Sequence, residues 1–180
     1  MTDLGPISWP PTPIRTERLV LREPQAQDRA TFIDMLSSTV VYAYLGGPRS
    51  REALESDIPE VPSKRPGVFT VERGGAMIGL ITLDRRAADR PGHLRPDIEE
   101  VELGYLLLPQ AWGFGYATEA CAAALEWFAR VLPGEPVVLC TQSANDRSIR
   151  LATRLGFTEV ERFQEFGAEQ WFGAWTPPST

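Results

Sequence analysis

Two glycines in the second half of the chain, Gly113 and Gly115, lie in the stretch "LPQAWGFGYATEA" between a strand-like apolar run and an alanine-rich, helix-like run. A strand that turns directly into a helix leaves the first backbone N–H groups of the helix unpaired, and the helix dipole adds partial positive charge there. Because glycine has no Cβ, the backbone of such a turn can approach a bulky anion closely. The pattern therefore predicts a phosphate-binding turn.

Three phosphate-binding patterns differ in how well this turn satisfies them. The dinucleotide pattern G-x-G-x-x-G fails at its third glycine, where the chain has Thr118, and the P-loop pattern fails because the turn has no lysine. The pattern Q/R-x-x-G-x-G/A is satisfied in full by Gln110, Gly113 and Gly115. For the bare pair of glycines, an ordinary tight turn between strand and helix stays open as the alternative.

Few other side chains suggest acid–base, nucleophilic or metal chemistry. Three glutamates within residues 99–102 lie on a predicted strand, where a solvated strand edge is the plain interpretation. Cys121 and Cys140 fall on a predicted helix and a predicted strand, so we expect reduced core residues. His93, the only histidine, lies in a polar loop and is expected to be solvent-exposed. No cluster has the spacing of a metal site, so no metal is expected.

Hydrophobic periodicity and capping residues predict the elements of the first half of the chain. Residues 18–23 alternate apolar and polar side chains, as a half-buried strand does, and a helix follows with Asp28 as its N-cap. Ser50 caps a second, short helix. Two strands then flank a glycine pair at positions 74–75, which indicates a hairpin. Residues 84–97 form a polar loop, long enough to suggest a functional or mobile segment.

The second half continues with alternating strands and helices. A strand over residues 98–108 contains Gly104, which marks a bulge or a close backbone approach. The helix after the glycine turn has an apolar face of mostly small residues, suited to lie close on a sheet. A strand at 136–142, a helix opened by Asn145 and closed by Gly156, and two final strands complete the order. The order predicts one α+β or α/β domain around a largely antiparallel sheet.

Composition narrows the class of protein. The 180 residues are 43% hydrophobic and 23% charged, which is typical of one globular domain. The net charge is −6, and the 18 basic residues are scattered, so no nucleic-acid partner is expected. The chain shows neither a signal peptide nor an apolar stretch long enough to cross a bilayer. We therefore expect a cytoplasmic protein without a membrane partner, with a proline-rich lead over residues 1–13 and a single domain over 14–176.

Four stretches together resemble the GCN5-related N-acetyltransferase (GNAT) superfamily, in the branch typified by the ribosomal-protein N-terminal acetyltransferases. "ELGYLLLPQAWGFGYATEA" resembles the pyrophosphate-binding segment, and "TERLVLREPQAQD" resembles the opening strand. "MIGLITL" is similar to the third strand, and "NDRSIRLATRLGF" to the helix that runs from an asparagine to a Gly-Phe pair. The stretches occur in the family's order and span roughly residues 14–175.

The resemblance implies an α+β fold, an α/β/α sandwich whose mixed, mostly antiparallel sheet has splayed fourth and fifth strands, here 99–108 and 137–142. Acetyl-CoA is the implied co-substrate, with its pantetheine arm between those strands. The backbone of Leu106, Leu107 and Leu108 is expected to pair with that arm. Asn145 and Ser148 would contact the pantetheine end and the thioester sulfur. The expected pyrophosphate ligands are Gln110 and the N–H groups of Trp112, Gly113, Phe114, Gly115, Tyr116, Ala117 and Thr118.

The implied reaction is direct acetyl transfer to a primary amine in a ternary complex. Because a free amine is protonated at neutral pH, a base must accept a proton, and Glu102 is the expected one, acting directly or through water. The implied oxyanion donor is a backbone N–H near Leu106, and such a donor contributes about 3 kcal/mol. Many relatives have a tyrosine that serves as the general acid at the position where this chain has Ala152. The expected acid in this chain is therefore Ser148. Tyr105 is the weaker option, since its side chain points to the opposite face from Glu102.

The acceptor is left open by the sequence: a peptide N-terminus, a polyamine and an aminoglycoside all fit an acidic protein. Its pocket is expected to form from the first two helices, the long loop and the final strands. Dimers are common in this branch, so a homodimer is a further expectation. The missing tyrosine supports one alternative, a non-catalytic acyl-CoA-binding sensor with the same fold. The aromatic candidates for the lining of the acceptor pocket are Tyr42, Tyr44, Trp171 and Trp175.

Overall fold

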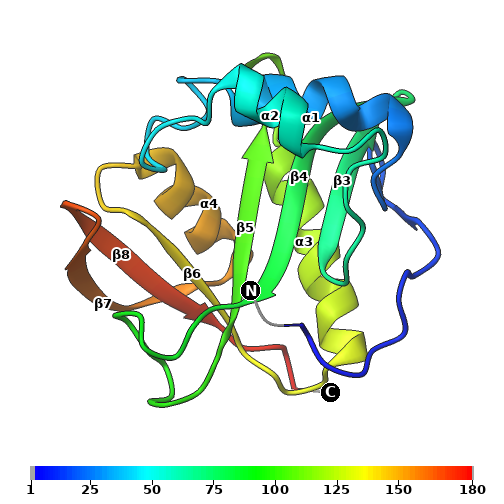
Figure 1. Cartoon of the computed structure of the whole chain (residues 1–180). Helices are drawn as coiled ribbons and strands as arrows, with labels where there is room; N and C mark the ends of the chain where they lie inside the picture. Colours follow the sequence, from blue (N-terminus) through cyan, green and yellow to red (C-terminus); the bar gives the residue numbers. More distant parts are fainter. Residues whose placement is uncertain (1–2, 180) are drawn as a thin grey trace.

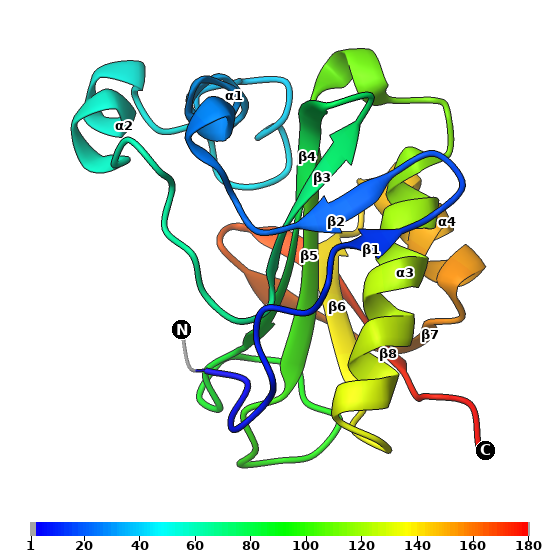
Figure 2. The same ribbon diagram turned by 90° about the vertical axis from the view of Figure 1, so that its right-hand side faces the viewer.

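The computed structural model describes residues 3–179, which form one eight-stranded mixed sheet between two pairs of helices (Figure 1). The strands are β1 (Ile14–Arg15), β2 (Val20–Arg22), β3 (Val68–Arg73), β4 (Ala76–Arg85), β5 (Val101–Leu107), β6 (Val137–Gln142), β7 (Thr158–Glu165) and β8 (Ala168–Trp175). The helices are α1 (Arg29–Leu36), α2 (Arg51–Asp57), α3 (Tyr116–Val131) and α4 (Asp146–Leu155), with short 3-10 turns η1 (Ala26–Asp28) and η2 (Pro109–Ala111). Figure 2 shows α1 and α2 on one face of the sheet and α3 and α4 on the other.

The predicted order of elements and the α+β sandwich are confirmed. The strands lie in the order β1-β2-β3-β4-β5-β6-β8-β7, and all neighbours except β5 and β6 are antiparallel. The two-residue strand β1 was not predicted, because two residues carry no periodicity. It shifts the numbering, so the fourth and fifth strands of the sequence prediction are β5 and β6.

The splay between β5 and β6 determines the shape of the molecule. The two strands pair only at their first residues, Val101 with Val137 and Glu102 with Val138. Further along, β5 stays paired with β4 and β6 stays paired with β8, so the two halves of the sheet diverge (Figure 1). The predicted splay is confirmed.

Local signals in the sequence mostly gave the right elements. The hairpin between β3 and β4 turns at Gly74 and Gly75, both at positive φ, as a two-residue hairpin requires. The Ser50 side chain accepts a hydrogen bond from the N–H of Ala53 and caps α2. Gly104 marks a close approach and not a bulge: the ladder to β4 has no register shift there, and a Cβ on Gly104 would lie 2.6 Å from Oγ1 of Thr82.

Asp28 precedes α1 as predicted, but its side chain does not cap that helix. The carboxylate instead accepts a hydrogen bond from the backbone N–H of Gln25 at 2.7 Å and pairs with the guanidinium of Arg22 at 2.7 and 3.0 Å. Both side chains are buried. A buried arginine needs a charge partner, so the ion pair takes the carboxylate away from the helix end.

The main hydrophobic core lies between the sheet and the helices α3 and α4, and the start of the chain contributes to it. Leu4 is 2% exposed and belongs to this core. The Trp9 ring packs edge-on against Phe69 of β3 and Trp127 of α3, with ring centroids 5.1 and 5.7 Å apart. The proline-rich lead therefore covers the part of the core that β3 and α3 form.

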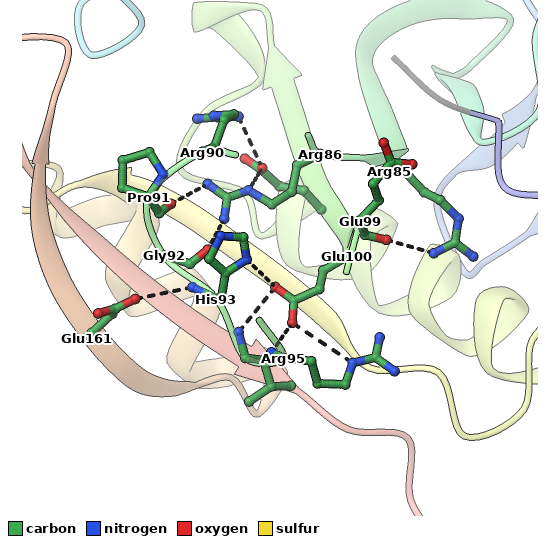
Figure 3. Close-up of polar contacts among 12 residues, drawn as sticks. Arg85, Arg86, Arg90, Pro91, Gly92, His93, Arg95, Glu99, Glu100 and Glu161 are labelled. Carbon is green, nitrogen blue, oxygen red and sulfur yellow. Dashed lines mark hydrogen bonds and ion pairs between the residues drawn. The ribbon is translucent and has the colours of Figure 1, made fainter. Parts of the chain in front are cut away.

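The long polar loop between β4 and β5 is held by buried charged side chains (Figure 3). The Arg86 guanidinium donates hydrogen bonds to the carbonyls of Pro91 and Gly92. The fully buried carboxylate of Glu100 accepts from the backbone N–H groups of Leu94 and Arg95, at 3.2 and 2.6 Å. These contacts satisfy the charges by means of the loop's own backbone.

The same loop is tied to β7. Arg90 pairs with Glu165 at 3.0 Å. The backbone N–H of His93 donates to Glu161 at 3.2 Å (Figure 3). The loop therefore packs on the sheet.

Candidate active site

A cavity of about 750 Å³ opens where β5 and β6 diverge. Its walls come from both strands, from the glycine turn and first turn of α3, from α4, and from the segment that follows α1. The lining residues are Val40, Val41, Ala43, Tyr44, Leu45, Glu102, Leu103, Gly104, Tyr105, Leu106, Leu107, Ala111, Trp112, Gly113, Gly115, Tyr116, Ala117, Thr118, Leu139, Cys140, Thr141, Asn145, Arg147, Ser148, Arg150, Leu151 and Arg154.

The glycine turn forms one end of the cavity. Gly113 and Gly115 have φ of +84° and +79°, and Gly115 is the N-cap of α3. No side chain caps α3, so the N–H groups of its first turn, at residues 116–118, have no partner within the helix. A Cβ on Gly113 would meet nothing within 4 Å. The turn is thus an exposed backbone surface at the positive end of a sixteen-residue helix.

Basic and aromatic side chains hold this turn in place. Arg18 donates to the carbonyl of Phe114 at 2.9 Å and pairs with Glu119 at 3.3 Å. Its guanidinium lies 4.5 Å from the centroid of the Tyr116 ring. The turn therefore keeps its shape by contacts behind the backbone, on the side away from the cavity.

Helix α4 presents three arginines to the cavity: Arg147, Arg150 and Arg154. The sequence prediction missed them. Their spacing of i, i+3 and i+7 places them on one face of a helix, and that periodicity was the available signal. The Arg147 guanidinium lies 4.6 Å from the centroid of the Trp112 ring, which directs it to the same end as the glycine turn.

Asn145 and Ser148 lie at the start of α4 as predicted. The Asn145 side chain accepts from the N–H of Ser148 at 3.3 Å and donates to Oγ1 of Thr141 at 3.3 Å. The asparagine therefore joins the end of β6 to the first turn of α4. Ser148 is buried, and its Oγ lies 2.6 Å from the hydroxyl of Tyr105 on β5, which bridges the gap between the strands.

Burial raises the pKa of Tyr105 to about 12, the main cause being desolvation of the phenolate. The hydroxyl pair therefore stays protonated at neutral pH. Ala152, one turn after Ser148 on α4, is fully buried in the core.

Hydrogen bonds at both ends of the pairing between β4 and β5 show which backbone groups of β5 point toward β4. The N–H of Leu108 donates to the carbonyl of Ile78, and the N–H of Arg86 donates to the carbonyl of Glu100, each at 2.9 Å. Pairing alternates in an antiparallel ladder, so the N–H of Leu106 also faces β4. The N–H of Leu106 itself is therefore used within the sheet, and an oxyanion donor near Leu106 stays a prediction for the neighbouring residues.

The backbone groups of β5 that point into the gap belong to Leu103, Tyr105 and Leu107. The carbonyl of Leu107 accepts from Nε1 of Trp112 at 3.0 Å. The N–H groups of Tyr105 and Leu107 are therefore the donors that this edge offers within the cavity. A shift of one residue in the pairing of two strands would reverse the direction of every backbone group. The assignment of these donors therefore depends on the register between the strands.

Glu102 lies on the opposite face of β5 from Tyr105, as the two-residue period of a strand requires. Its carboxylate is 2.9 Å from Nε of Arg86 and 3.6 Å from the guanidinium of Arg90. Burial raises the pKa of Glu102, and the two guanidinium groups oppose that effect. Cys140, on β6, lines the cavity on this face too, and burial raises the pKa of its thiol to about 12. The thiol is therefore not ionised at neutral pH.

Several predicted residues do not line the cavity. Leu108, Gln110 and Phe114 are outside the wall, with Gln110 exposed in the turn η2. Of the four aromatic residues proposed for the acceptor pocket, only Tyr44 lines the cavity, and Trp171 is a buried core residue. Cys121 is a buried free thiol, as expected.

His93 is not simply solvent-exposed as expected. Its Nδ1 is buried, 3.9 Å from the carboxylate of Glu100. Within residues 3–179, no group of histidine, cysteine and acidic side chains could hold a metal ion. No helix in that range is long and apolar enough to cross a membrane.

The sheet splays between β5 and β6, with a glycine turn and a helix N-terminus at its open end, as the resemblance of the sequence implies, and comparison with known proteins identifies the family. Residues 18–158 match the model of the acetyltransferase (GNAT) domain, so the chain belongs to the GNAT acetyltransferase family.

Three solved structures are similar in fold over nearly the whole chain. The acetyltransferase (GNAT family) from Bacillus anthracis is 18% identical, with a TM-score of 0.73 over 92% of this chain and 98% of that one. Spermidine N-acetyltransferase from Vibrio cholerae, in complex with CoA and spermine, is 18% identical, with a TM-score of 0.67 over 89% and 96%. RimL, a ribosomal L7/L12 alpha-N-protein acetyltransferase, is 15% identical, with a TM-score of 0.70 over 92% and 94%.

Proposed function

We propose that this protein transfers the acetyl group of acetyl-CoA to a primary amine by direct attack of the amine on the thioester. One observation carries the proposal: the cavity passes through the gap between β5 and β6, with the exposed turn of α3 at one end and a partly buried carboxylate, Glu102, on the other face. A transferase needs such access from two sides, because donor and acceptor must meet at one atom.

The residues present fit coenzyme A. The N–H groups at the start of α3 suit the pyrophosphate, and the arginines of α4 suit further phosphate charge. The unpaired edge of β5 offers amide groups for the two amides of a pantetheine arm, as an added strand would. The structures of neighbours with CoA support the same co-substrate. Bound at this place, acetyl-CoA would supply the activated acyl group.

On the face of α1 and α2, Glu102 would act as the base. The acceptor ammonium must lose a proton before it attacks, and a carboxylate with a raised pKa accepts one at neutral pH better than an ordinary glutamate. Arg86 and Arg90 orient the carboxylate and lower its pKa against the effect of burial. Glu102 then holds the proton that the amine nitrogen gives up as the new carbon–nitrogen bond forms.

On the face of α3 and α4, Ser148 and Tyr105 would serve the leaving sulfur. The hydroxyl pair donates a hydrogen bond to the sulfur as the carbon–sulfur bond breaks, which stabilises the thiolate that leaves. The opposite orientation of Tyr105 and Glu102, which counted against Tyr105 in the sequence, suits this division of roles. The N–H groups of Tyr105 and Leu107 are the donors we propose for the developing oxyanion.

The alternative of a non-catalytic acyl-CoA sensor rested on the absence of a tyrosine at Ala152. Tyr105 places a phenolic hydroxyl 2.6 Å from Ser148 by another route, which weakens that argument. Titration calorimetry with acetyl-CoA, followed by thiol release across a panel of amines, separates the two. Binding with amine-dependent release and an acetylated product supports the transferase; binding without release from any amine supports the sensor; no binding contradicts both.

A further inference from the structure

The acceptor side of the cavity is bordered by an apolar segment. Residues 40–45, which follow α1, contribute Val40, Val41, Ala43, Tyr44 and Leu45 to the wall. Val40 and Leu45 are each 55% exposed and Tyr44 is 40% exposed, although all three border a cavity. Val41 and Leu106 of β5 pack against the same buried cluster, which includes Met35, so the segment lies over the same face as Glu102.

Exposed apolar side chains around a cavity indicate a ligand that covers them. The exposed apolar residues of this segment line the same cavity as Leu106 and Glu102. The part of a ligand that passes the segment would contact carbon and not charge.

The charges of the wall argue in the same direction. Among the described residues that line the cavity, Glu102 is the single acidic one. Its carboxylate already carries two guanidinium neighbours. A polycation would need several carboxylates to replace its water, and this wall offers one, already paired.

Carboxylates near Glu102 add no free negative charge to the acceptor side, because arginines pair with them. Glu165 pairs with Arg90 at 3.0 Å, and Asp84, opposite Glu102 in the ladder, pairs with Arg65. Neither carboxylate therefore adds an unpaired negative charge beside Glu102.

From this arrangement we propose that the acceptor is an amine with a single positive charge and an apolar substituent, which lies against Val40, Tyr44 and Leu45. The inference rests on the proposed acetyl transfer and specifies its substrate class. An arylalkylamine and a peptide N-terminus with an apolar first side chain share this chemistry. Polyamines and aminoglycosides do not.

Thiol release with acetyl-CoA tests the class on matched acceptors. We expect kcat/KM to be at least about tenfold higher for 2-phenylethylamine than for spermidine, the range that apolar pocket contacts provide. A short peptide that begins with leucine, compared with one that begins with lysine, tests the second source. A preference for 2-phenylethylamine alone indicates a small-molecule acceptor, and a preference confined to the leucine peptide indicates a peptide acceptor.

A matched pair of variants tests the segment itself. Val40→Glu adds a carboxylate at the cavity border, and Val160→Glu makes the same change at a 40% exposed valine on β7. We expect Val40→Glu to lower kcat/KM for 2-phenylethylamine about tenfold and to raise it for spermidine, whereas Val160→Glu changes neither. The Kd for acetyl-CoA should be the same in both variants.

The failures of the two proposals are distinguishable. If no amine of the panel supports thiol release, the proposed acetyl transfer itself fails. If release occurs but spermidine is the better acceptor in the unchanged protein, or if Val40→Glu alters neither acceptor, acetyl transfer stands and the apolar acceptor class is overturned.

Discussion

Glu102 is subject to two opposing influences that together suit a base. Its burial disfavours the charged form, and the guanidinium groups of Arg86 and Arg90 favour it. A carboxylate without the arginines would be neutral too often, and one fully exposed to water would be a weaker base. The same pair of arginines fixes the direction of the carboxylate toward the cavity.

Removal of the carboxylate charge tests this role most directly. We expect Glu102→Gln to lower kcat about 10²- to 10⁴-fold, the usual contribution of a general base, with an unchanged Kd for acetyl-CoA. Glu99→Gln is the control, since Glu99 lies just before β5 and does not line the cavity. Steady-state thiol release and calorimetry measure the two quantities. A Glu102→Gln protein with full kcat would remove Glu102 from the mechanism.

The pH dependence follows from the direction of the Glu102 pKa. The base must be deprotonated, so the rate falls as the pH drops through a pKa above the ordinary glutamate value of about 4.3. Arg90 lowers that pKa, so Arg90→Gln should move the acidic limb to higher pH. Rates are divided by the neutral fraction of the acceptor, so that the ionisation of the amine does not enter.

Arg162→Gln is the control for the pH dependence of the rate in Arg90→Gln. Arg162 also pairs with two glutamates, Glu159 and Glu169, but is exposed and distant from the cavity wall. Its loss should leave the acidic limb in place. A shift of the limb to lower pH in Arg90→Gln, or no shift, would show that Glu102 is not the titrating group.

The hydroxyl pair makes a separate prediction on the opposite face. Ser148→Ala and Tyr105→Phe should each lower kcat, with a smaller change in the KM for the amine, because they act on the leaving sulfur. Since the two hydroxyls act as a unit, the double variant should be little slower than the slower single variant. Thr153→Ala, an exposed hydroxyl on the same helix α4, is the control. Strictly additive losses would indicate two independent roles.

At the scale of an element, the N-terminus of α3 needs Gly113 and Gly115 for their backbone conformation, and not because a side chain there would clash. A Cβ on Gly115 would meet only an Arg18 nitrogen, at 3.5 Å, yet its φ of +79° costs an L-residue about 1–2 kcal/mol. Gly134 has the same φ of +79°, with nothing within 4 Å, in the turn between α3 and β6.

Alanine at these two positions separates strain from binding. Gly115→Ala and Gly134→Ala should each lose about 1–2 kcal/mol of unfolding free energy in urea. Only Gly115→Ala should also weaken acetyl-CoA binding, because it distorts the N–H groups that we propose as ligands of the pyrophosphate. Equal Kd values in the two variants would place the pyrophosphate elsewhere.

Elements that depend on local chemistry were predictable from the sequence. Asn145 as a cap, Gly156 as a helix end and the hairpin at Gly74 and Gly75 each need only neighbouring residues, and the structure has all of them. Asp28 was misread because its partner, Arg22, competes with the helix end through the fold. The direction of the Leu106 N–H depends on the register between β4 and β5, which no local pattern specifies.

The candidate site was predictable in its main parts and not in its surroundings. The glycine turn, Asn145, Ser148 and Glu102 all reach one cavity, although 46 positions separate Glu102 from Ser148 in the numbering of the chain. The bond between Tyr105 and Ser148, and the arginine partners of Glu102, arise from packing between distant segments. Such pairings require the topology of the sheet, so a single sequence reveals them only through a resemblance.

At the scale of the whole molecule, the splay of the sheet gives each face its own chemistry. The face of α3 and α4 holds the glycine turn and the hydroxyl pair, and the face of α1 and α2 holds the carboxylate and the apolar segment. The gap between β5 and β6 joins the two. This requires a rigid frame, since the two halves of the sheet share only two residue pairs.

The start of the chain is part of that frame. Leu4 is 2% exposed within the main core, so Leu4→Ala should cost about 2–5 kcal/mol of unfolding free energy, as a buried leucine does when a cavity replaces it. Leu94→Ala, the same change at a 37% exposed side chain, should cost about 0.5 kcal/mol or less. Urea unfolding followed by tryptophan fluorescence reports on both, because Trp9 and Trp127 pack in the same core. Since Leu4 does not line the cavity, the Kd for acetyl-CoA should be unchanged well below the unfolding transition. Equal stability of the two variants would show that the lead is not part of the folded unit, and that β3 and α3 hold the core without it.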